Sequence, residues 1–152
     1  MKKFFISVIA TVIVLLAAAS PGLAAESVTQ TWTNCTATVD CLALAWQADP
    51  NGALTATASN RSIDGYVIQV VTNPGATAPT DNYDIALNNS DGADVCGGAL
   101  ADRDTATSEI ALPKPDGTNY VEAWVSGILT LAVTGNSEDS ATGTIKVYIR
   151  RP

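Results

Sequence analysis

The large apolar positions along the chain recur with a period of two, which is typical of β-strands with one buried face. Residues 42–48, LALAWQA, carry a large apolar side chain at every second position. Residues 49–52, Asp-Pro-Asn-Gly, form a typical turn sequence, and residues 54–58 then alternate again. The pattern predicts that the two flanking segments pair as a β-hairpin across this turn.

Further short segments of strand character follow along the chain. Residues 66–72 are apolar on both faces, as expected for a central strand. No segment shows a sustained helical period with caps. We therefore predict an all-β fold, a single antiparallel β-sandwich of jelly-roll or immunoglobulin-like type with seven to nine short strands. The other expected strands are residues 28–33, 83–87, 121–125, 128–134 and 144–150.

The first 25 residues have the pattern of a secretory signal peptide. Lys2 and Lys3 precede an uncharged apolar run over residues 4–18, and Ser20-Pro21-Gly22 then leads to small residues at the expected cleavage site. The alternative is an uncleaved membrane anchor, since the uncharged stretch is nearly long enough to span a bilayer. We expect cleavage, export to the periplasm or the outside of the cell, one domain over residues 26–152, and no membrane contact afterwards.

Composition excludes several classes of function. The 152 residues include 8 Lys and Arg, 15 Asp and Glu and no His, for a net charge of −7. Loss of Lys2 and Lys3 with the signal peptide leaves six basic residues and a net charge of −9. Without histidine there is no Ser-His-Asp triad, Cys-His pair or imidazole metal site. The acidic balance argues against nucleic acid as a partner.

Three cysteines leave two kinds of pairing open. A bridge between Cys35 and Cys41 contributes roughly 2.4 kcal/mol by chain entropy, against roughly 4 kcal/mol for either one paired with Cys96. The short bridge forms more readily because its partners meet more often in the unfolded chain. We therefore predict Cys35–Cys41. Cys96 is then a free thiol, either buried as a small hydrophobic residue or available for pairing with another chain.

Carboxylates are the remaining candidates for chemistry. Asp91 and Asp94 lie close together in loop-like sequence, where oxygen ligands would suit Ca²⁺, although the spacing does not match an EF-hand. The alternative is that such aspartates bond their own turn backbone. Glu109 and Glu122 are formally a glycosidase pair, but nothing in the sequence marks either one as raised in pKa. We expect no enzymatic activity and no cofactor.

The chain from about residue 65 to 150 carries a resemblance. Residues 83–87 lead to Asp-Gly-Ala-Asp at 91–94, a Gly-Gly step, and Asp102-Arg103, and late strands at 127–131 and 143–148 follow. This resembles small β-rich proteins encoded among the structural genes of tailed bacteriophages and prophages, here preceded by a secretory signal. The resemblance implies a virion-associated or structural part.

These observations predict how the protein acts. We expect an exported, non-enzymatic β-sandwich subunit that works through protein partners or self-association, with edge strands or Cys96 joining copies. Arg103 is predicted to hold its loop by an ion pair, with Asp104 as the expected partner and Asp102 or Glu109 as alternatives. The alternative function is an extracellular carbohydrate- or Ca²⁺-binding module that uses exposed aromatic residues and the aspartate turns.

Overall fold

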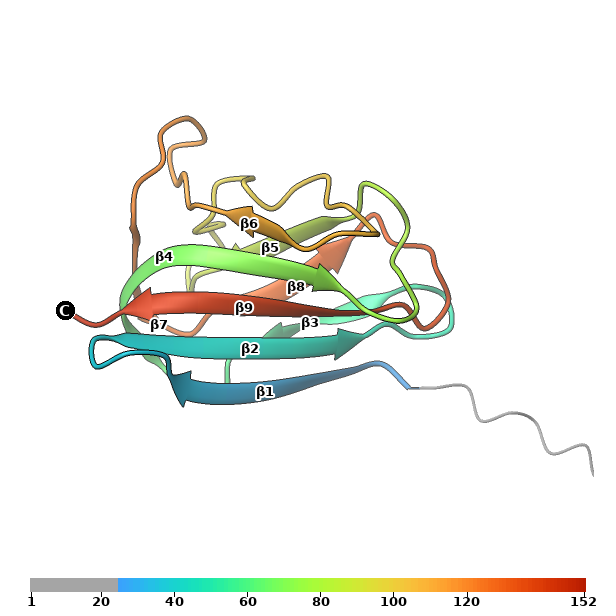
Figure 1. Cartoon of the computed structure of the whole chain (residues 1–152), viewed down its shortest axis with the longest axis horizontal. Coiled ribbons are helices and arrows are strands. Elements are labelled where there is room, and N and C mark those ends of the chain that lie inside the picture. The colour runs from blue at the N-terminus through green and yellow to red at the C-terminus, as the bar shows by residue number, and fades with distance from the viewer. Residues whose placement is uncertain (1–24) are drawn as a thin grey trace, which may run out of the picture.

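The computed structural model describes residues 25–152, and its regular structure there is entirely β (Figure 1). The predicted signal peptide therefore lies outside the described residues, apart from Ala25. Within the described range, no helix has the length and apolarity needed to span a membrane. The strands are β1 (Ser27–Asn34), β2 (Val39–Gln47), β3 (Leu54–Ala58), β4 (Ile63–Pro74), β5 (Asp84–Asn88), β6 (Glu109–Ala111), β7 (Ala123–Gly127), β8 (Thr130–Thr134) and β9 (Thr142–Arg150).

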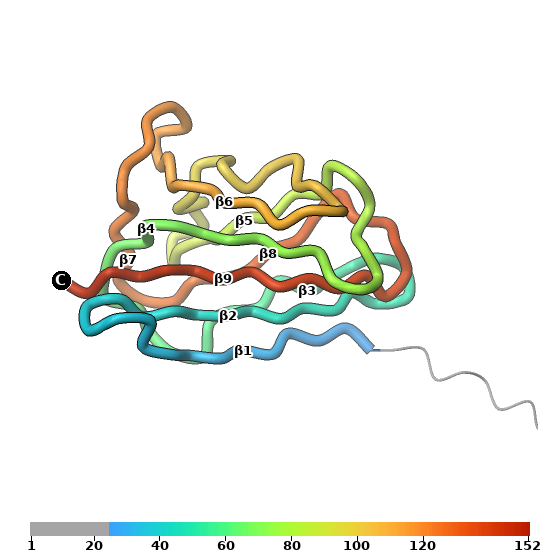
Figure 2. Tube along the Cα trace, in the orientation of Figure 1, coloured from blue at the N-terminus to red at the C-terminus, as the bar shows by residue number. Residues whose placement is uncertain are grey.

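The strands form two antiparallel sheets. The large sheet has six strands in the order β1-β2-β9-β4, and β6 and β7 share the far side of β4. The small sheet has the order β3-β8-β5. Figure 2 shows β1 and β6 at opposite edges of the large sheet. The predicted all-β, antiparallel architecture is confirmed, whereas the choice between jelly-roll and immunoglobulin-like topology stays a prediction.

The alternating residues of both sheets meet in one shared core. Inward side chains of β2 and β9 pack with those of β5 and β8, and most of the outward positions between them are polar or small, with Tyr148 as an aromatic exception. Gly143 of β9 lies opposite Trp46 of β2, and a Cβ at residue 143 would come within 2.7 Å of the indole ring. The largest core side chain of β2 therefore fits only because β9 has glycine there.

The predicted hairpin between residues 42–48 and 54–58 is wrong. β2 pairs with β1 and β9 in the large sheet, whereas β3 pairs with β8 in the small sheet. The turn itself is present, because Asp49 accepts the amide of Ala53 at 2.8 Å and Gly52 has a φ of 79°. A turn sequence specifies that the chain reverses, but not which strand becomes its neighbour.

β4 is the central strand that the sequence predicts. It pairs with β9 on one side and with β6 and β7 on the other. A β-bulge between Val67 and Gln69 lies where β6 ends and β7 begins on the opposite side of β4. Sequence analysis missed β6 because three residues are too few to show an alternation.

Candidate interaction sites

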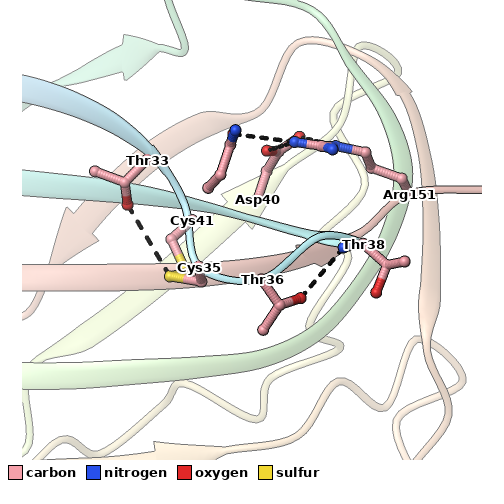
Figure 3. The surroundings of a disulfide bond; sticks show 8 residues. Thr33, Cys35, Thr36, Thr38, Asp40, Cys41 and Arg151 are labelled. Atoms are coloured by element: carbon pink, nitrogen blue, oxygen red, sulfur yellow. Dashed lines mark hydrogen bonds and ion pairs between the residues drawn. A yellow bond between two sulfur atoms is a disulfide. The ribbon is translucent and has the colours of Figure 1, made fainter.

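A disulfide closes the connection between β1 and β2. Cys35 and Cys41 are bonded, with 5.7 Å between their Cα atoms, which confirms the predicted pairing (Figure 3). Cys41 is a β2 residue paired with Thr33 of β1, and Cys35 follows β1 directly. The bridge therefore fixes one end of the β1–β2 ladder.

Arg151 fastens the C-terminal end of β9 to the same hairpin. Its Nε donates to Asp40 at 2.8 Å (Figure 3). Its other guanidinium nitrogens donate to Asp40, to the Ala37 carbonyl and to the Asn34 side chain. Its amide also donates to the Thr38 carbonyl at 2.9 Å. The hydrogen bond from Arg151 lowers the pKa of the Asp40 carboxyl below its usual value, against the opposing effect of burial.

Cys96 is buried in the core, with 1% of its surface exposed. Burial, assisted by the nearby Asp94 charge, raises the pKa of its thiol to about 12. Of the two alternatives for the free thiol, the structure therefore matches the small hydrophobic residue. A folded chain does not present this sulfur to another copy.

The predicted metal ligand Asp94 is a turn cap in the structure. Its carboxylate accepts the amides of Cys96 at 3.0 Å and Gly98 at 2.8 Å, while Asp91 is exposed and its amide donates to Asn89. Among residues 25–152, no group of three Cys, Asp or Glu side chains could hold a metal ion. The arrangement of Asp94 is that of an aspartate bonding its own turn.

Arg103 has a different ion-pair partner from the expected Asp104. Its guanidinium lies 3.5 Å from the Glu109 carboxylate, and the two side chains are only 13% and 30% exposed. Asp104 instead accepts the amides of Ala106 and Thr107, and these bonds lower its pKa. Glu109 is the partner of Arg103 because it belongs to β6, and the position of β6 beside residues 98–103 could not be predicted from the sequence.

The two glutamates of the formal glycosidase pair each have an arginine partner. Glu109 pairs with Arg103, and Glu122 pairs with Arg150. The bond from Arg150 lowers the pKa of Glu122, whereas a general acid requires a raised pKa. Glu122 therefore does not have the raised pKa that a general acid requires.

Aromatic side chains lie on the outer face of the large sheet. Trp124 is 48% exposed, and its ring meets that of Tyr66 with 4.9 Å between centroids. Arg150 lies over the Tyr66 ring and Lys146 over the Tyr148 ring. Cations of the chain itself therefore cover part of this aromatic surface.

The free edge of β3 is closed by side chains of β1 and of the residue before it. Glu26 accepts both the amide and the hydroxyl of Thr55 at 2.7 Å. Gln30 donates to the Ala58 carbonyl at 2.7 Å and accepts the amide of Asn60 at 2.8 Å. These bonds occupy backbone groups that another strand would need, so this edge is protected.

The free edge of β5 is closed by the segment that follows it. The amide of Ile85 donates to Leu100, and the Leu87 carbonyl accepts the amide of Val95, both at 2.9 Å. The Tyr83 carbonyl, just before β5, accepts the amide of Arg103 at 2.8 Å. The chain itself therefore acts as an additional strand along β5.

β1 is the long edge that remains open. Within the described residues, backbone hydrogen bonds reach β1 only from β2. The strand has eight residues, SVTQTWTN, and none of them is charged. Its outward threonines Thr29, Thr31 and Thr33 are exposed. An uncharged edge of this length, without a bulge or a cap, is a template for pairing with another strand.

At the opposite edge, β6 borders a groove. The groove has a volume of about 630 Å³ and lies between β6 and residues 98–103, with Lys114 and Tyr120 also in its lining. Ile110 is 69% exposed, Leu112 44% and Tyr120 70%. These neighbouring apolar side chains form an uncovered patch. The groove together with this patch is here called the β6 groove.

Comparison with known proteins found no matching protein-family model, curated protein or solved structure. The functional interpretation therefore rests on the edges and the groove. The sequence pattern predicts that edge strands make contacts, but it does not identify β1 or the groove as the open ones. The signal for β1 was present, because residues 27–34 are strand-like and uncharged in an acidic chain.

The Asp40–Arg151 pair is expected to make stability depend on pH. Because the folded pKa of Asp40 is depressed, its contribution is present above the ordinary carboxyl range and is lost as pH falls through the folded pKa. The melting temperature of the wild type should exceed that of Asp40→Asn most at neutral pH, and the two melting temperatures should converge under acid conditions. An equal difference at all pH values would contradict this assignment.

The Cys96 thiol is expected to resist modification in the folded protein. A thiol reagent should label it slowly in buffer and rapidly in denaturant, because both burial and the raised pKa suppress the thiolate. Mass spectrometry of the unreduced protein would count one label per chain. Rapid labelling under native conditions would show that Cys96 is accessible.

Proposed function

We propose that the protein is an exported, non-enzymatic structural subunit that acts through protein–protein contacts, and that β1 makes these contacts. The observation that carries the proposal is the contrast between edges. Side chains close β3 and a chain segment closes β5, whereas β1 keeps an eight-residue row of backbone groups free of any bond from outside β2.

The length of β1 suits strand pairing. Eight residues extend about 26 Å at about 3.3 Å per residue, and each new backbone hydrogen bond contributes about 0.5–1.5 kcal/mol. Several such bonds together offset the cost of bringing two chains together. Added-strand contacts of this kind obtain their affinity from the main chain.

Charge also directs contact to this edge. Beyond the predicted signal peptide the chain has fifteen acidic and six basic residues, and all of them lie outside β1. Two copies that approach through their acidic turns repel each other, whereas an approach along β1 brings neutral surfaces together.

The surroundings of β1 hold it in an extended, rigid form. The Cys35–Cys41 bridge and the Arg151 bonds fix one end of the β1–β2 hairpin. Glu26 and Gln30 tie the strand across to β3. A pre-organised strand loses less conformational entropy on binding, which favours association. The disulfide also fits the oxidising conditions expected outside the cytoplasm.

Lysines on β1 are expected to weaken assembly strongly. Thr29→Lys combined with Thr31→Lys should weaken self-association by about tenfold or more. Positive charge on an edge strand opposes pairing with another strand, and the backbone hydrogen bonds between the two chains are then lost. Sedimentation velocity over a range of protein concentrations would measure the effect.

The matched control is Thr144→Lys, which adds a lysine to the centre of the large sheet instead of its edge. This variant should assemble as the wild type does. A wild type that remains strictly monomeric at high concentration, with no binding to other exported proteins of its host, would refute the proposed function.

A further inference from the structure

We propose that copies of this chain join head to tail, with β1 of one copy adding to β6 of the next in the β6 groove. The inference rests on the proposed function and names the partner as a second copy. The two strands lie at opposite edges of the same sheet (Figure 1). Their pairing therefore continues the large sheet from one molecule into the next.

On each side of the molecule, an edge of the large sheet lies beside an edge of the small sheet. Side chains at β1 bond to β3, which places these two edges on one side. The segment that closes β5 lines the groove beside β6, which places those edges on the other side. Within one molecule β1 and β6 run in the same direction, because each of the four steps between them in the sheet is antiparallel. Antiparallel entry of β1 into the groove therefore turns the second molecule over. Its small sheet then lies on the opposite face of the continuous large sheet, away from the segment that closes β5 of its neighbour.

The groove offers the space and the apolar surface for an added strand. Among the described residues, backbone bonds reach β6 only from β4, so its outer edge is unpaired. Pairing of β1 with another β1 would leave Ile110, Leu112 and Tyr120 exposed. Entry of β1 into the groove covers them, which removes apolar surface from water.

The walls of the groove are fixed before any partner arrives. Arg103 in one wall pairs with Glu109 of β6 in the other, and its guanidinium also donates to the Ala101 carbonyl. The amide of Lys114 donates to the Cys96 carbonyl at 3.2 Å. A groove held in this way accepts a strand with little reorganisation.

Charge selects the direction of the added strand. Glu26 directly precedes β1, and Lys114 lies just beyond β6. Within residues 25–152 neither side chain forms an ion pair. Antiparallel pairing brings the start of β1 to the end of β6 and so brings Glu26 close to Lys114. The four residues Glu109–Leu112 then pair with the first half of β1.

A contact between two different surfaces of identical chains is heterologous. After binding, the pair as a whole keeps one free β1 and one free groove, so assembly continues into an open series unless the rotation closes a ring. A β1–β1 contact would instead be two-fold symmetric and would stop at a dimer. The two arrangements therefore differ in the species they form.

Mixing two blocked variants distinguishes these arrangements. The β1-blocked chain carries Thr29→Lys and Thr31→Lys, and the groove-blocked chain carries Ile110→Lys and Leu112→Lys at exposed positions. In a head-to-tail assembly each variant alone is monomeric, and the mixture forms a one-to-one dimer that grows no further. The wild type forms a series of oligomers. Sedimentation velocity and light scattering identify all of these species.

The control is Ile128→Lys, an exposed apolar position outside the lining of the groove, which should assemble as the wild type does. Circular dichroism confirms that each variant is folded. A groove-blocked variant that still dimerises, or a mixture that stays monomeric while the wild type assembles, overturns the head-to-tail contact but leaves the proposed function intact. A monomeric wild type that also binds no exported host protein overturns both.

Removal of each charge tests the direction of the strand. Glu26→Gln, which keeps a side-chain oxygen to accept a bond from Thr55, and Lys114→Gln should each weaken wild-type assembly by about fivefold, the upper end of the range for an exposed ion pair. The double variant should be no weaker than either single variant, because each single change already removes the pair. A double variant as weak as the two single variants combined overturns the antiparallel register.

Discussion

The structure depends on how the backbone groups at the sheet edges are satisfied. Two sheets of this size have four edges, and each presents amides and carbonyls that need a partner in protein or water. Glu26 and Gln30 provide side-chain partners for β3, and residues 94–103 provide main-chain partners for β5. These solutions explain why a long loop follows β5 and why polar side chains surround β1. They leave β1 and β6 without a second partner among the described residues, as they do the short β7 on the same side of β4 as β6.

The same constraint links features that are distant in sequence. The Cys35–Cys41 bridge and Arg151 act on the β1–β2 hairpin from the start and the end of the fold, so the open edge is also a firmly held one. The pair of Arg103 with Glu109 joins the segment that closes β5 to β6, and this contact shapes the groove. Local interactions that stabilise the sandwich therefore also hold β1 and the walls of the groove in place.

The extent to which the sequence predicts this arrangement follows from the range of each interaction. Alternation within β2 and β9 is local, and their faces and approximate bounds are predicted. The partner of β3 is not, because its turn is compatible with either sheet and the decision depends on β8, more than seventy residues away. β6 is too short for a pattern, and the predicted Arg103–Asp104 pair failed because Glu109 comes close only through β6. Open edges are a property of the whole sheet and have no local signature beyond the absence of charge.

Most of the acidic residues lie at turns and loops, and they are absent from β1. Asp49 and Asp104 accept backbone amides of their own turns, which lowers the pKa of each. Asp116 accepts the Asn119 side chain and the backbone amides of Asn119 and Thr118, and these bonds lower its pKa to about 2. These groups are negative at any physiological pH and stand at the turns, so they cap the backbone and also repel other copies there. An acidic protein of this kind associates most readily where charge is absent or compensated. β1 has no charged side chain, and the β6 groove holds Arg103 and Lys114 beside Asp102 and Glu109. Charge thus favours contact at β1 and β6, whose outer edges hydrogen bonding leaves open.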